Sequence, residues 1–236
     1  MRPEVIVDGV ESLGVKLSRE FETLARTAID ARRQFVIALP GGSVATTFFP
    51  SLARATVEWS GTEFFWIDER AFSPNDPASN YALALRLWLS PARVPMAHVH
   101  RMRGEEGDLA LAARNAAEEL IAVAGDPPRL DVALVGVGED GHIASLFPGR
   151  FDLDDNRHVT PVYDAPKPPP RRLTMTLPVL ASAGRVIVAA IGPSKAGPVG
   201  VALEQESCAT PLAELLRRSS SPLMLLDRDA ASLLSK

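Results

Sequence analysis

One histidine in a glycine-rich turn is the strongest candidate for acid–base chemistry. His142 ends the segment Gly-Val-Gly-Glu-Asp-Gly-His, which follows an apolar run over residues 132–135. The ordinary pKa of a histidine lies near neutrality, so a neutral imidazole can take a proton from water and return it later. We therefore expect His142 to act as a general base. We interpret His98, His100 and His158 as structural or solvated, because the pair at 98 and 100 lacks the third ligand and the spacing of a metal site.

Three charged residues follow a second apolar run, which covers residues 64–67. Taken alone, Asp68, Glu69 and Arg70 fit a solvated loop with local salt bridges. If the run is a buried strand, they lie at the mouth of a sheet, where a guanidinium can stabilise an oxyanion. Arg70 and Asp68 are therefore candidate catalytic residues.

Other segments carry groups that could together bind a phosphate. A Pro-Gly-Gly-Ser turn between an apolar run and a helix allows close approach of backbone N–H groups, and the helix N-terminus adds partial positive charge. An arginine after a proline-rich segment and a lysine in Gly-Pro-Ser-Lys could complete a site for a dianion. Each feature also has an ordinary structural explanation, such as a capped turn or a surface lysine. The candidates are Gly41, Gly42, Ser43, Arg172 and Lys195.

Alternating strands and helices would position these groups. Continuous apolar runs predict buried strands over residues 35–39, 64–67, 132–135, 172–177, 185–191 and 223–226. Helical spacing predicts helices over 11–33, 80–89, 105–124, 194–203, 211–218 and 228–235, with a short one ending at Leu52.

This alternation indicates an α/β fold with parallel β-α-β units. We expect one layered domain over residues 1–236, with a mostly parallel, Rossmann-like sheet flanked by helices. Ligands bind such sheets at the carboxyl ends of the strands, where the candidate residues fall. Residues 148–171, rich in Pro, Asp and Arg, are expected to form an irregular loop or a lid.

Composition narrows the possible partners. The formal net charge of −4, from 25 basic and 29 acidic residues, argues against a broad nucleic-acid or anionic-membrane surface. The apolar stretch over 173–194 contains Pro178 and Arg185, which favours two strands and a turn over a membrane span. Acidic residues near the start are unlike a signal peptide, and the single cysteine excludes an intrachain disulfide. We expect a cytoplasmic monomer or weak dimer.

The order of the motifs resembles the glucosamine-6-phosphate isomerase/6-phosphogluconolactonase family, in particular its lactonases. Gly-Gly-Ser is followed by Asp-Glu-Arg with Ser-Asn-Tyr, then Gly-Glu-Asp-Gly-His-Ile-Ala-Ser-Leu-Phe-Pro-Gly, Lys-Pro-Pro-Pro-x-Arg-Leu-Thr and Gly-x-x-Lys. The resemblance covers about residues 35–200. It implies a sugar-phosphate isomerase-like fold and hydrolysis of 6-phospho-D-glucono-1,5-lactone to 6-phospho-D-gluconate in the oxidative pentose phosphate pathway. It implies no metal and no organic cofactor.

The resemblance also implies roles for single residues. His142 matches the general base, and Arg70 matches an arginine near the lactone carbonyl. The family's phosphate-binding positions are matched by Gly42, Ser43, Arg172 and Lys195. Its site carboxylates are matched by Asp68 and Asp140. The family often has Thr after Gly-Gly-Ser, whereas this chain has Val44, so no hydroxyl contact is expected from that position.

Two alternatives remain open. An amino-sugar-phosphate deaminase–isomerase is similar in fold and also carries an Asp-Gly-His block. It typically has Asp-Glu-Tyr where this chain has Arg70 as the third residue, and a glutamate where this chain has Phe147. A non-catalytic sugar-phosphate-binding regulator would need only the phosphate site, so His142 and Arg70 speak against it.

Overall fold

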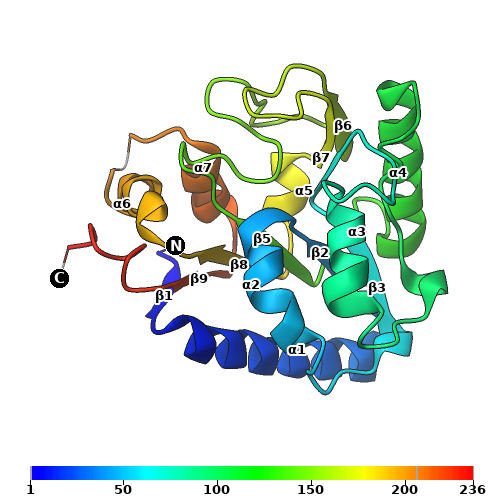
Figure 1. Ribbon diagram of the computed structural model, residues 1–236, viewed down its shortest axis with the longest axis horizontal. Helices are drawn as coiled ribbons and strands as arrows, with labels where there is room; N and C mark the ends of the chain where they lie inside the picture. The colour runs from blue at the N-terminus through cyan, green and yellow to red at the C-terminus, as the bar shows by residue number, and fades with distance from the viewer. Residues whose placement is uncertain (1, 206, 236) are drawn as a thin grey trace.

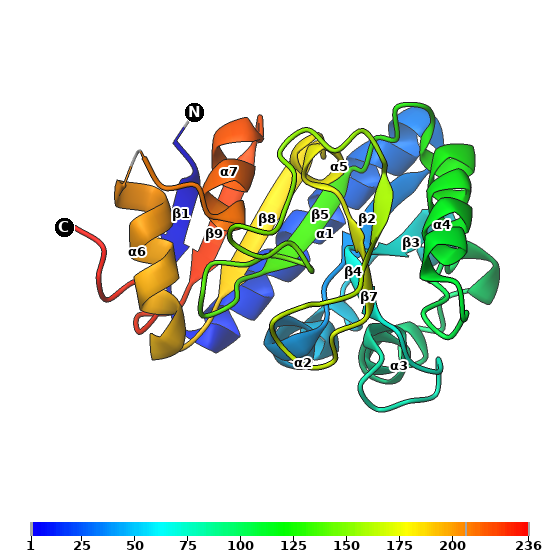
Figure 2. The same ribbon diagram turned by 90° about the horizontal axis from the view of Figure 1, so that it is seen from above.

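The computed structural model describes residues 2–205 and 207–235. Its centre is a six-stranded sheet in which every neighbouring pair of strands is parallel. Figure 2 shows the strands side by side in the order β1, β9, β8, β5, β2, β3. Their bounds are β1 (Glu4–Val7), β9 (Pro222–Leu226), β8 (Arg185–Ala190), β5 (Val132–Gly136), β2 (Phe35–Leu39) and β3 (Thr62–Trp66).

Helices cover both faces of this sheet (Figure 1). One face packs against α1 (Val10–Arg32), α2 (Gly42–Leu52) and α3 (Asn80–Ala84), which continues as a π-helical turn over Leu85–Leu89. The other face packs against α4 (Leu109–Ala124), α5 (Leu177–Ala181), α6 (Ala196–Glu204) and α7 (Pro211–Arg218). The fold class predicted from the sequence is confirmed.

Burial on both faces explains the continuous apolar runs. In β2, Phe35 and Ile37 pack on the side of α1 and α2, whereas Val36 and Ala38 pack on the side of α4, and all four are buried. Successive side chains of a strand point to opposite faces, so a strand covered on both sides must be apolar throughout.

A second, three-stranded sheet was not foreseen. It consists of β4 (Asp68–Arg70), β7 (Arg172–Met175) and β6 (Val159–Val162), and both pairings are antiparallel. The prediction of a strand at 172–177 was therefore right in type, but this strand lies outside the parallel sheet. Residues 148–171 were expected to be irregular throughout, yet they contain β6.

Two segments at the ends of the chain also differ from expectation. The edge strand β1 was not predicted, and residues 228–233 form turns in place of the predicted helix. The Asp227 carboxylate accepts hydrogen bonds from Ala230 N at 2.8 Å and Gly192 N at 3.0 Å, which ties this segment to the end of β8. Within the described ranges, no helix is both long and apolar enough to cross a bilayer.

Candidate active site

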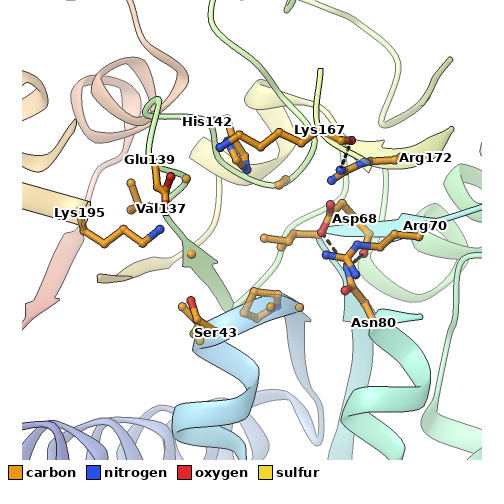
Figure 3. A pocket seen from close by; sticks show the side chains of 18 residues that line it. Ser43, Asp68, Arg70, Asn80, Val137, Glu139, His142, Lys167, Arg172 and Lys195 are labelled. Atoms are coloured by element: carbon orange, nitrogen blue, oxygen red, sulfur yellow. Dashed lines mark hydrogen bonds between the residues drawn. The ribbon is translucent and has the colours of Figure 1, made fainter. Parts of the chain in front are cut away.

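A cavity of about 420 Å³ opens at the carboxyl ends of the parallel strands (Figure 3). The loops after β2, β3, β5 and β8 line it together with residues from β4, β7 and α3. All the site residues predicted from the sequence line this cavity except Asp140, which contacts the imidazole of His142. Segments far apart in the chain thus bring their polar groups to one place.

A carboxylate partner orients the imidazole of His142. Its Nδ1 lies 2.5 Å from Oδ1 of Asp140, so the proton on Nδ1 points at the carboxylate and Nε2 remains as an acceptor. Burial lowers the pKa of His142 below its ordinary value, and the Asp140 hydrogen bond opposes this only in part. The imidazole is therefore neutral at pH 7 and able to accept a proton.

The glycines of the turn after β5 make room for this imidazole. A Cβ atom on Gly138 would lie 1.9 Å from Nδ1 of His142, so only glycine fits there. Gly141 adopts φ +81°, a conformation that side chains disfavour. On another side, the ring of Phe147 packs with its centroid 4.8 Å from that of the imidazole.

Arg70 is fixed at one end of its guanidinium. One terminal nitrogen, Nη1, donates to the carbonyl oxygen of Ala78 at 2.7 Å. Its Nε is buried and meets no acceptor among the residues that the structure describes. Because the guanidinium carries five N–H donors, most remain available at the cavity wall.

The neighbouring Glu69 organises the loop that carries these groups. Its buried carboxylate accepts hydrogen bonds from the backbone N–H groups of Arg70, Asn80 and Tyr81 and from the Ser79 hydroxyl, at 2.7–2.9 Å. It therefore caps the start of α3 and fixes Arg70 relative to Asn80. Asp68, Glu69 and Arg70 therefore do not form the solvated loop that their sequence, taken alone, also fitted.

Asp68 is a buried carboxylate with both oxygens engaged. Its Oδ1 accepts from Asn80 Nδ2 at 3.1 Å, and its Oδ2 accepts from Ser145 Oγ at 2.6 Å. Asp68 therefore links β4 to α3 and to the segment that follows His142. The segment that follows His142 is thereby tied to β4, the strand that carries Arg70.

The glycine turn after β2 has the features of an anion site. Gly42 adopts φ +63°, and Ser43 lies exposed in the first turn of α2. No side chain of the described residues caps this helix, so its first N–H groups remain open to a ligand. Lys195, after β8, lines the same cavity. Val44 is buried and contributes no polar group, as expected.

Arg172 lines the cavity, but most of its N–H groups donate hydrogen bonds inside the protein. Its Nε donates to Pro169 O at 2.9 Å, and its Nη2 donates to Lys167 O at 2.7 Å and to Pro168 O at 3.1 Å. Nη1 lies 3.4 Å from Ser145 Oγ. Burial lowers the pKa of Arg172, although a guanidinium stays charged at neutral pH. Its predicted role in phosphate binding stays a prediction, and its visible role is to hold the proline-rich loop.

The sequence did not single out Asn80, Glu139 or Lys167, which also line the cavity. Asn80 and Lys167 belong to the Ser-Asn-Tyr and Lys-Pro-Pro-Pro motifs, so their signal was present. What the motifs could not show was that the loops fold back over the sheet. Within the described part of the chain, no group of three His, Cys, Asp or Glu side chains is arranged to hold a metal ion.

The fold and the cavity define a class: a sugar-phosphate isomerase-like α/β protein with a carboxylate-paired histidine and a helix N-terminus without a side-chain cap in one cavity. The sequence profile described as "Glucosamine-6-phosphate isomerases/6-phosphogluconolactonase" matches residues 9–224. The chain belongs to this family.

Individual relatives agree with this assignment. The 6-phosphogluconolactonase of Mycobacterium tuberculosis is 39% identical over 216 residues, which is 87% of this chain and 87% of that protein. The structure of 6-phosphogluconolactonase from Trypanosoma brucei has a TM-score of 0.86 at 24% identity and covers 99% of both chains. A monomeric glucosamine-6-phosphate deaminase has a TM-score of 0.82 at 22% identity and covers 99% of this chain and 100% of its own. The last two comparisons concern the fold alone.

Proposed function

We propose that this chain is a 6-phosphogluconolactonase, which hydrolyses 6-phospho-D-glucono-1,5-lactone to 6-phospho-D-gluconate in the oxidative pentose phosphate pathway. The observation that carries the proposal is that the His142 imidazole, paired with Asp140, lines one cavity together with Arg70 and an open helix N-terminus. Curated relatives named 6-phosphogluconolactonase support it.

The chemical step needs an activated water and stabilisation of charge on one oxygen. Neutral His142 takes a proton on Nε2 from water as the water oxygen attacks C1 of the lactone. Arg70 donates to the oxyanion that develops on the former carbonyl oxygen. The tetrahedral intermediate collapses by breaking the bond from C1 to the ring oxygen, and the imidazolium returns its proton to that oxygen. Asp140 holds the ring and stabilises the transient positive charge.

The phosphate positions the lactone for this step. It is largely dianionic at pH 7. It binds at the N-terminus of α2, where Ser43 and the turn at Gly41 and Gly42 offer donors, and Lys195 supplies a positive charge. Fixing this end of the substrate holds C1 near His142, which converts an encounter into an oriented reaction.

The deaminase alternative fits this cavity less well. Deamination moves a proton between two carbons, so it needs further groups to assist ring opening besides the Asp140 carboxylate that pairs with His142. At the position where that family has a glutamate, the aromatic ring of Phe147 packs against His142. Arg70 occupies the place of the family's tyrosine. A phenyl ring cannot accept or deliver a proton, so the site favours hydrolysis.

Two assays on the same preparation separate these functions. The purified protein is expected to accelerate the opening of freshly generated 6-phosphogluconolactone above its spontaneous rate. It is expected to release no ammonia from glucosamine 6-phosphate above background. Enzyme-dependent ammonia release without accelerated lactone opening would reverse the ranking of the two functions.

A further inference from the structure

Lys167 crosses the mouth of the cavity toward the catalytic base. Its side chain extends from the proline-rich loop along the cavity to His142 (Figure 3). Its Nζ lies 3.5 Å from Oδ1 of Asp140, the same oxygen that lies 2.5 Å from Nδ1 of His142. A primary ammonium and an imidazole therefore share one carboxylate oxygen.

The backbone of Lys167 is unusually well held for a surface loop. The buried guanidinium of Arg172 donates to the carbonyl oxygens of Lys167, Pro168 and Pro169, three consecutive residues. Ala165 N also donates to Pro170 O at 2.9 Å. The ammonium of Lys167 is thus attached to a loop whose backbone is held in place by hydrogen bonds.

We propose that Lys167 is a positioning residue that keeps His142 in its neutral, proton-accepting form. Its ammonium places a positive charge near the imidazole. It also interacts with the Asp140 carboxylate, which then stabilises a protonated His142 less strongly than it would without Lys167. This inference rests on the proposed function only for its consequence in catalysis; the effect on His142 stands on the geometry.

The other charged groups around His142 define what Lys167 must offset. Asp140 on the same loop and Asp68 from β4 both favour the protonated imidazole. Glu139 lines the cavity from the same loop. Phe147, which packs against His142, also contacts a cation. The guanidinium carbon of Arg172 lies 5.6 Å from the centroid of its phenyl ring. The carboxylates are thus concentrated near the base, and a nearby cation adds to the effect of burial in opposing them.

The same charge assists the second half of the reaction. After His142 has accepted a proton, the ammonium of Lys167 repels the imidazolium and makes it a stronger acid. The proton then passes more readily to the departing ring oxygen. Lys167 acts here through His142 and not by contact with the reacting atoms.

The test measures the titration of His142 directly, by NMR of its imidazole Cε1–H in the ligand-free protein. Lys167→Gln is expected to raise the pKa of His142 by about half a unit, since the cation is partly exposed and solvent screens it. Lys167→Arg keeps the charge and should restore most of the wild-type value. Lys195→Gln removes a different lysine from the same cavity and should shift His142 less. An unchanged titration in Lys167→Gln, or an equal shift in Lys195→Gln, would overturn the proposal.

A second readout connects this effect to turnover. In Lys167→Gln the acid limb of kcat/KM for the phosphorylated lactone should move to higher pH by the same amount as the NMR titration. If the NMR shift occurs but the acid limb stays in place, Lys167 does not set the working form of the base, and the proposal fails. If the wild type does not accelerate lactone opening, the proposed function fails, while the NMR titration still decides the effect of Lys167 on His142.

Discussion

The guanidinium of Arg70 lines the cavity, and we propose that it stabilises the oxyanion of the reaction. Glu69 and Ala78 hold its backbone and one end of its guanidinium, so its remaining donors have a defined direction. Preorganised donors of this kind stabilise an oxyanion at little cost in reorganisation during the reaction. Its contribution should therefore appear in the transition state more than in the bound ground state.

For Arg70→Ala we expect kcat for lactone opening to fall by about 10²–10³-fold, the usual loss of an oxyanion donor. The affinity for 6-phosphogluconate, measured by calorimetry, should change much less. Arg101→Ala, which removes an arginine outside the cavity, serves as the control. A variant whose Kd rises as much as its kcat falls would show that Arg70 binds substrate without a special role in the reaction.

Among single residues, the sequence predicted which side chains line the cavity better than it predicted their partners. His142 and Arg70 could be predicted because glycines and strand ends leave a local pattern. The commitment of Arg172 to the carbonyl oxygens of Lys167 and Pro168 could not, because it depends on how a loop folds back on the strand that follows it.

Among the elements, the turn between β2 and α2 is the most sterically constrained part of the proposed phosphate site. A Cβ atom on Gly41 would lie 1.7 Å from Oδ1 of Asn80. Asn80 cannot easily move away, because its amide nitrogen donates to both the carbonyl and the carboxylate of Asp68. The glycine turn and the carboxylate are therefore coupled through one amide.

Gly41→Ala is expected to weaken the binding of 6-phosphogluconate by about tenfold or more, since overpacking costs about 1–3 kcal/mol and here displaces the anion-binding turn. Gly107→Ala is a matched control, because a Cβ there meets nothing within 4 Å. Calorimetric titration of both variants checks the expectation. Equal affinities in the two would mean that the turn tolerates a side chain.

A chain of histidines and carboxylates joins β3 to α4 away from the cavity. His100 lies 2.7 Å from Glu63 through Nε2 and 2.8 Å from Glu119 through Nδ1, and His98 lies 2.9 Å from the other oxygen of Glu63. A neutral imidazole has only one N–H, so His100 must be protonated to donate to both carboxylates. Burial lowers the pKa of His100, but the hydrogen bonds to Glu119 and Glu63 outweigh it and raise the pKa above 6.5. The structural role expected for these histidines agrees with this arrangement.

This arrangement predicts a pH-dependent contribution to stability. The contribution is fully present below the unfolded-state pKa of about 6.5 and is lost as pH rises through the higher pKa of the folded state. His100→Gln should therefore destabilise the protein more at pH 6 than at pH 9, by about 1 kcal/mol, because solvent reaches part of the cluster. Urea unfolding at both pH values, with His158→Gln as control, measures this. An effect that is the same at both pH values would contradict the protonated state.

The elements themselves could be predicted where burial is two-sided. β2 and β5 are apolar throughout, β8 is apolar after Arg185, and all three were located closely. β4, β6 and β7 were missed or misplaced because these short strands pair outside the parallel sheet, and β4 joins β7 across about a hundred positions, as between Asp68 and Thr174. β1 was missed because it is a four-residue edge strand whose Val5 and Val7 are largely exposed.

The whole molecule works as a rigid frame that collects groups from distant segments. The parallel sheet supplies the glycine turns at Gly41 and Gly138, and the small antiparallel sheet supplies Asp68, Arg70 and Arg172. Hydrogen bonds from Ser145 and Asn80 to Asp68 tie the small sheet to the loop after β5 and to α3. Reactive groups fixed in this way on rigid elements can act on a substrate anchored by its phosphate.

Within this arrangement we propose that His142 activates water for lactone opening. The most direct measurement is the rate of 6-phosphogluconolactone opening, corrected for spontaneous hydrolysis, by the wild type and by His142→Gln at pH 7. We predict clear acceleration by the wild type and a fall in kcat of about 10²–10⁴-fold in the variant, the usual contribution of a general base. Binding of 6-phosphogluconate should change little. A variant that keeps nearly the full kcat would contradict the account.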